Sequence, residues 1–111
     1  MYRFASIADA VEGAAELEEA WFLLASRRGS CSEPSRPADF TVSADQTHLQ
    51  CCTEPSDPRP VETCLYIARY RTHVVRLYAD LIAITLQDMS RLAEEIDTKM
   101  VACLREEQPG D

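Results

Sequence analysis

Five cysteines and two histidines are the residues of this chain with the widest chemical range. They are Cys31, Cys51, Cys52, Cys64, Cys103, His48 and His73. His48, Cys51 and Cys52 lie close together, and Cys31 and His73 are available to complete a metal site. The chain has no Cys-x-x-Cys pair, which is the spacing typical of zinc sites. In a strand, His48 and Cys51 would also point to opposite faces. The sequence therefore predicts no metal ligands and no cofactor.

The number and spacing of the cysteines also bear on the redox state. Five is an odd number, and the spacing follows no disulfide framework, so reduced thiols are expected. The chain opens Met1-Tyr2-Arg3-Phe4 and then turns acidic, unlike a signal peptide. No apolar run approaches the roughly 20 residues of a membrane-spanning helix. These features predict a cytoplasmic protein that binds no membrane and is held together by packing.

Catalysis and nucleic-acid binding find little support in the sequence. A nucleophile elbow, a Gly-rich oxyanion loop and a phosphate loop are all missing from a chain with three glycines. The carboxylates fall on helix faces that are typical of solvent exposure. With 11 basic and 19 acidic residues, the net charge of −8 repels a phosphate backbone. We expect no enzyme and no nucleic-acid partner; the alternative is a small Cys/His metal-binding or enzyme-like protein.

Aromatic and arginine residues favour a protein partner instead. Tyr and Arg side chains beside each other are common in the hot spots of protein–protein interfaces. The residues predicted to bind a partner are Phe22, Tyr66, Arg69, Tyr70 and Tyr78. Burial of the same tyrosines in the protomer core explains the sequence equally well.

A first helix is predicted over residues 7–28. Ser6 and Asp9 resemble a capping box, and apolar residues then recur every three or four positions as far as Leu24. Arg27, Arg28 and Gly29 are typical of a helix end. Residues 30–59 form a Pro-rich connector, within which alternating polar and apolar residues predict a hairpin over 39–51.

A second, very long helix is predicted over residues 60–107, because no Gly and no further Pro interrupts the stretch before Pro109. Such a helix would be about 70 Å long, which one small protomer cannot cover. Its segment 74–86 is apolar nearly all round, which indicates burial on more than one side. We therefore expect a single domain over 1–111 of mostly α class that forms a homodimer. The predicted self-association residues are Val74, Leu77, Leu81 and Ile84.

The order of these segments resembles that of a known protein family. An acidic first helix containing Ala5-Ser6-Ile7-Ala8 and Trp21-Phe22-Leu23-Leu24 precedes a Pro-rich middle, and Tyr66-Ile67-Ala68-Arg69-Tyr70-Arg71 leads into the second helix. In size and general character the chain resembles the QslA family of small bacterial anti-activators of quorum sensing. The resemblance implies a dimeric helical protein that binds the ligand-binding domain of a LuxR-type regulator such as LasR. Such binding would block the regulator's dimerisation and hence its DNA binding.

Overall fold

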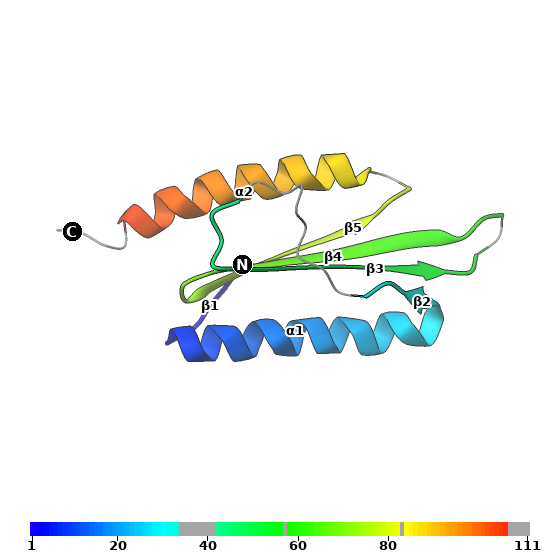
Figure 1. Ribbon diagram of the computed structural model, residues 1–111, viewed down its shortest axis with the longest axis horizontal. Helices are drawn as coiled ribbons and strands as arrows, with labels where there is room; N and C mark the ends of the chain where they lie inside the picture. Colours follow the sequence, from blue (N-terminus) through cyan, green and yellow to red (C-terminus); the bar gives the residue numbers. More distant parts are fainter. Residues whose placement is uncertain (34–41, 57, 83, 107–111) are drawn as a thin grey trace.

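Two helices sandwich a five-stranded antiparallel sheet, so the fold is a mixed α/β arrangement of three layers (Figure 1). The computed structural model describes residues 1–33, 42–56, 58–82 and 84–106. The elements are β1 Tyr2–Arg3, α1 Ile7–Arg28, β2 Ser30–Cys31, β3 Gln46–Glu54, β4 Val61–Tyr70, β5 His73–Asp80 and α2 Leu86–Glu106. The strand order across the sheet is β1-β5-β4-β3-β2.

The prediction of a mostly α fold with one helix over 60–107 is wrong. That stretch forms β4, β5 and α2, with β4 paired to β5 from Thr63 opposite Asp80 to Tyr70 opposite His73. The chain reverses at Arg71, whose backbone takes a positive φ of 55° without a glycine. The segment contains apolar residues at nearly every position because it forms interior strands, and each face of these strands is covered by a helix. Periodicity alone does not separate these two cases.

The hairpin predicted over 39–51 is only half right. Its second strand exists, as the first part of β3, but β3 pairs with β4 on one side and with β2 on the other. Residues 42 and 43 belong to no strand, and 39–41 lie outside the described residues. The connector therefore contributes a central strand of the main sheet instead of a separate hairpin.

The helix α1 has the bounds that the sequence predicts, Ile7–Arg28. The hydroxyl of Ser6 accepts a hydrogen bond from the Asp9 N–H at 3.1 Å, which satisfies one donor of the first turn. The first half of the helix packs closely on the sheet because its inward residues are small. Ala10 and Ala14 are buried against Leu65, Ile67 and Val74.

The opposite face of the sheet carries larger side chains. Tyr66, Ala68 and Tyr70 of β4 pack with Met89, Ala93 and Met100 of α2 in one buried cluster. The Tyr70 hydroxyl donates to Asp97 Oδ1 at 2.6 Å, and the same oxygen accepts from the Ser43 N–H at 2.8 Å. A buried polar group thus finds its partner, which avoids the cost of an unmade hydrogen bond.

Two disulfides join neighbouring strands, so the expectation of five reduced thiols is wrong for four of them. Cys31–Cys52 ties β2 to β3, and Cys51–Cys64 ties β3 to β4. Cys51 and Cys52 are consecutive on one strand and therefore point to opposite faces. Cys103 is the free thiol. No helix within the described residues is long and apolar enough to cross a membrane.

Candidate functional site

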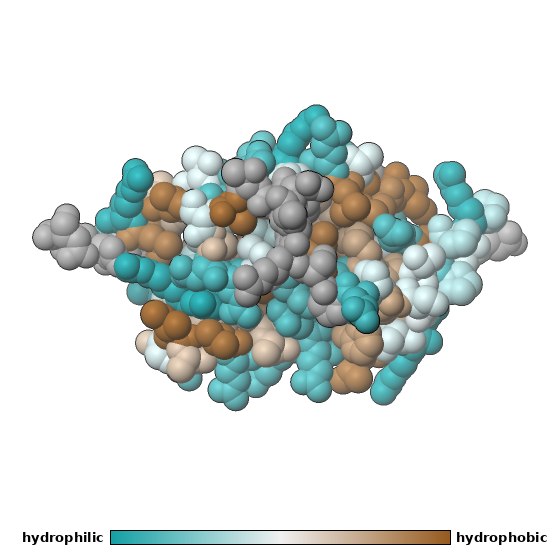
Figure 2. Space-filling view, in the orientation of Figure 1, coloured by the Kyte–Doolittle hydropathy of each residue, from teal (hydrophilic) through white to brown (hydrophobic). Residues whose placement is uncertain are grey.

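The last turns of α1 expose large apolar side chains. Phe22, Leu23 and Leu24 are 41%, 51% and 61% exposed. At about 100° per residue, three consecutive positions span roughly 200° of the helix circumference. Apolar surface therefore faces solvent on both flanks and on the crest of the helix, and we name these three residues the α1 ridge. In the space-filling view, apolar side chains interrupt the hydrophilic surface in the layer of α1 (Figure 2).

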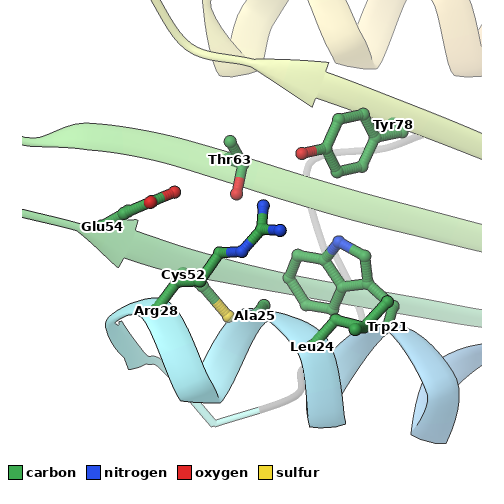
Figure 3. Close-up of a pocket in the computed structure, with 8 residues that line it drawn as sticks. All are labelled: Trp21, Leu24, Ala25, Arg28, Cys52, Glu54, Thr63 and Tyr78. Atoms are coloured by element: carbon green, nitrogen blue, oxygen red, sulfur yellow. The ribbon is translucent and has the colours of Figure 1, made fainter.

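A cavity of about 230 Å³ lies on one flank of the ridge, between α1 and the sheet (Figure 3). We name it the Trp21 cavity; it is lined by Trp21, Leu24, Ala25, Arg28, Cys52, Glu54, Thr63 and Tyr78. Figure 3 shows the Arg28 side chain extending from α1 toward Thr63, with the Trp21 indole beside it. Its lining combines aromatic surface, a buried disulfide sulfur and a few polar groups, as ligand and side-chain pockets commonly do.

The guanidinium in this cavity is available to a partner. Among the residues that the structure describes, Arg28 has no ion-pair partner. Glu54 lines the same cavity without pairing to it. An unpaired arginine beside an aromatic ring suits a carboxylate bound in the bidentate manner.

A second hollow lies on the other flank of the ridge. It is about 340 Å³, and we name it the His48 hollow; it is lined by Ala15, Glu18, Glu19, Phe22, His48 and Gln50. His48 Nδ1 is 3.5 Å from Glu18 Oε1. His48 Nε2 is buried and has no hydrogen-bond partner among the described residues. With the carboxylates of Glu18 and Glu19 in its lining, this hollow suits a cationic or hydrogen-bond-donating group, whereas the Trp21 cavity with Arg28 suits an anionic one.

The residues predicted to bind a partner are divided by the structure. Phe22 lines the His48 hollow, and Tyr78, 56% exposed, lines the Trp21 cavity. Tyr66 and Tyr70 are buried in the core against α2. Arg69 is occupied locally, since its Nε donates to Gln46 at 3.2 Å and its Nη1 to the Arg71 carbonyl at 3.1 Å.

The residues predicted for self-association, and the Cys and His residues considered and rejected as metal ligands, lie elsewhere in the fold. Val74 is fully buried under α1. Leu77, Leu81 and Ile84 pack, partly buried, against the core on the α2 face. His48 faces α1, whereas Cys51 faces α2, so these two do not meet. His73 is buried at the start of β5, and Cys31 and Cys52 are bonded to each other.

Sequence reasoning missed the exposed Leu23 and Leu24 of the ridge and the role of Arg28 in the Trp21 cavity. The run Trp21-Phe22-Leu23-Leu24 could nevertheless have indicated the exposed apolar surface. Four consecutive large apolar residues exceed what one buried face of a helix can hold. Such a run near a helix end indicates apolar surface left for a partner.

Comparison with known proteins identifies no relative. No protein family, no curated protein and no solved structure matches this chain. The resemblance to the QslA anti-activators thus rests on the sequence character alone, and the helical fold that it implies is not the fold of this protein.

Proposed function

We propose that this protein is a non-enzymatic inhibitor that acts by docking the α1 ridge on an apolar surface of another protein. The observation that carries the proposal is the exposure of Phe22, Leu23 and Leu24 between two hollows. Interfaces gain most of their energy from a few aromatic or apolar anchors near their centre, which fill pockets and exclude water. The ridge supplies such anchors, and the hollows receive side chains of the partner.

The charges on the two flanks specify the partner further. Arg28 in the Trp21 cavity calls for an acidic group, and the carboxylates of the His48 hollow call for a basic one. A partner helix with an apolar stripe, an acidic residue on one side and a basic residue on the other satisfies both. Complementary charges of this kind set register and association rate more than affinity.

The identity of the partner in this proposal comes from the resemblance. It is a LuxR-type transcription regulator, whose dimerisation surface would be covered so that it no longer binds DNA. The proposal still includes a homodimer of the inhibitor. Its interface would be a surface other than the predicted one, which consists of Val74, Leu77, Leu81 and Ile84. Cytoplasmic localisation stays part of it too. Because the cytosol reduces disulfides, the proposal requires that the fold persists when Cys31–Cys52 and Cys51–Cys64 are open.

The test is a titration of the purified ligand-binding domain of a LuxR-type regulator with the reduced protein, followed by calorimetry. Leu23→Asp places a charge on the crest of the ridge and is expected to weaken binding by at least about tenfold. Leu92→Asp is the matched control, because Leu92 is an exposed leucine on α2. Wild-type protein that does not bind the domain, or an equal loss with Leu92→Asp, would refute the proposal.

A further inference from the structure

Three potential metal ligands meet on the face of the sheet that α2 covers. The sulfurs of Cys51 and Cys64 and a carboxylate oxygen of Glu62 all lie within 4.8 Å of one another. The pairing of β3 with β4 explains this, since Cys51 stands opposite Cys64 in the register. Glu62 lies two residues before Cys64 and so points to the same face of β4.

We infer that Cys51, Cys64 and Glu62 bind a zinc ion when the Cys51–Cys64 disulfide is reduced. Two thiolates and a carboxylate are ligands that Zn²⁺ takes in proteins, and water would complete the tetrahedron. With Zn–S bonds of about 2.3 Å, the sulfurs of a tetrahedral site are about 3.8 Å apart. Directly opposed residues of an antiparallel pair have Cβ atoms roughly 4.5–5.5 Å apart, so both side chains can reach one ion.

The disulfide and the zinc complex exclude each other. Zinc is bound by thiolates, and Cys51 and Cys64 cannot be thiolates while their sulfurs are bonded to each other. A cellular dithiol donates two electrons to the disulfide, becomes a disulfide itself and leaves Cys51 and Cys64 as thiols. Zinc then displaces one proton from each thiol, and the two protons go to solvent. When a disulfide reoxidises Cys51 and Cys64, it is itself reduced to two thiols, the Cys51–Cys64 bond forms again and the zinc ion is released.

The surroundings of the three ligands admit an ion from one side. Glu62 is exposed, Cys51 is partly buried and Cys64 is fully buried. The ion therefore meets the carboxylate first and the inner thiolate last. The backbone at Glu62 is held in place, because its carbonyl accepts from the Leu81 N–H at 2.9 Å.

The second disulfide provides an internal comparison. Cys31–Cys52 also joins neighbouring strands, but on the opposite face. Within the described part of the chain, no third ligand-type side chain places its ligand atom within 4.8 Å of both sulfurs of that pair. Reduction of both disulfides is thus expected to create one zinc site and one plain dithiol.

The experiment uses the full chain with Cys31→Ser and Cys52→Ser, so that only the proposed site keeps a cysteine pair. A phosphine reductant opens the disulfide, since a dithiol would itself chelate zinc. Co²⁺ is titrated as a spectroscopic probe of thiolate ligation, and Zn²⁺ is then added in competition. The expected result is one ion per chain, a thiolate charge-transfer band, and no binding to the oxidised protein.

Glu62→Gln removes a ligand without touching the thiols and is expected to weaken binding at least tenfold. Glu12→Gln, an exposed carboxylate on α1, is the matched control and should bind as the parent does. Far-ultraviolet circular dichroism before each titration verifies that every variant is folded. A parent that binds no Co²⁺ when reduced, or a Glu62→Gln variant with unchanged affinity, would overturn the inference.

Discussion

The two faces of the sheet are covered by helices of similar length in different ways. Against α2 the sheet presents large side chains, with Tyr66 and Tyr70 fully or almost fully buried. On the other face the fully buried side chains of α1 are those of the small Ala10 and Ala14 in its first half, and Leu17 and Trp21 further along are only partly buried. The second half of α1 leaves a cavity beside Trp21.

This difference separates stability from binding. A layer filled with large side chains buries more apolar area and stabilises the fold more strongly. On the α1 side, the small Ala10 and Ala14 fill the contact at one end of the helix, whereas Trp21 and Leu24 line a cavity at the other end. The Trp21 cavity and the α1 ridge occupy that second end. We therefore expect substitutions on the α2 face to affect folding and those on the ridge to affect binding.

The largest difference in stability between the two faces should appear when one tyrosine on each face is truncated to alanine. Tyr70→Ala creates a cavity in the α2 layer and removes the hydrogen bond to Asp97, so the free energy of unfolding should fall by about 3–5 kcal/mol. Tyr78→Ala, at an exposed position, should change it by about 0.5 kcal/mol or less. Urea unfolding of both variants measures the difference. Equal losses would mean that the two layers are not distinct in stability.

The sequence predicts α1 well because several local features agree there. Ser6 at the start, a regular apolar face and Gly29 at the end all indicate one helix, and its bounds are correct. The region after Pro60 lacks such punctuation. Its turn at Arg71 uses a positive φ without glycine, and the strands on either side are apolar on both faces. In sequence, a central strand covered on both faces therefore has the same continuous apolar pattern as a buried helix.

The candidate site was predictable only in part, for a related reason. Of the residues predicted to bind a partner, Phe22 and Tyr78 lie at the surface, whereas Tyr66 and Tyr70 are core residues because their strand is central. The cysteine pairs depend on strand register. Cys51 meets Cys64 only because β3 and β4 align as they do, and cysteine spacing alone does not specify that alignment.

Alkaline pH should weaken the α2 layer selectively. Burial raises the pKa of Tyr66 to about 12, with a smaller contribution from the Asp97 charge. Burial also raises the pKa of Tyr70, and its hydrogen bond to Asp97 adds to the effect. A tyrosine in the unfolded chain ionises near pH 10. Between pH 10 and 12 the unfolded chain thus binds fewer protons than the folded one, and stability falls as pH rises.

Each of the two tyrosines should contribute up to about 1.4 kcal/mol per pH unit in that range. Urea midpoints at pH 9 and pH 11, with the disulfides intact, measure the loss. Tyr66→Phe keeps the ring and removes the ionisable group, so its loss should be smaller than that of the wild type. If Tyr66→Phe loses as much stability as the wild type, ionisation in the α2 layer is not the cause.

The smallest difference concerns how the two helices begin. At α2 the Thr85 hydroxyl accepts from the Asp88 N–H at 3.1 Å, and the Asp88 carboxylate accepts from the Thr85 N–H at 3.0 Å. At α1, among the described residues, only the first of these contacts has an equivalent, which is the hydrogen bond from the Asp9 N–H to the Ser6 hydroxyl. The hydrogen bonds from Thr85 hold the pKa of Asp88 below its usual range, so its contribution is present at neutral pH and lost as pH falls below about 4.

Removal of either cap should destabilise the fold by about 0.5–2 kcal/mol, with Thr85→Ala toward the upper end and Ser6→Ala toward the lower. The reciprocal cap at α2 loses one of its two bonds and loosens the other, whereas α1 loses a single bond. Thermal unfolding at pH 7 and at pH 3 measures both variants. The gap between them should be present at pH 7 and should narrow as the pH falls through the lowered pKa of Asp88, where its carboxylate takes up a proton. Because the proposed binding surface lies at the other end of α1, Ser6→Ala should leave partner affinity unchanged. A Ser6→Ala variant that binds more weakly would show that the two halves of α1 are coupled, and stability and binding would then not be separable along this helix.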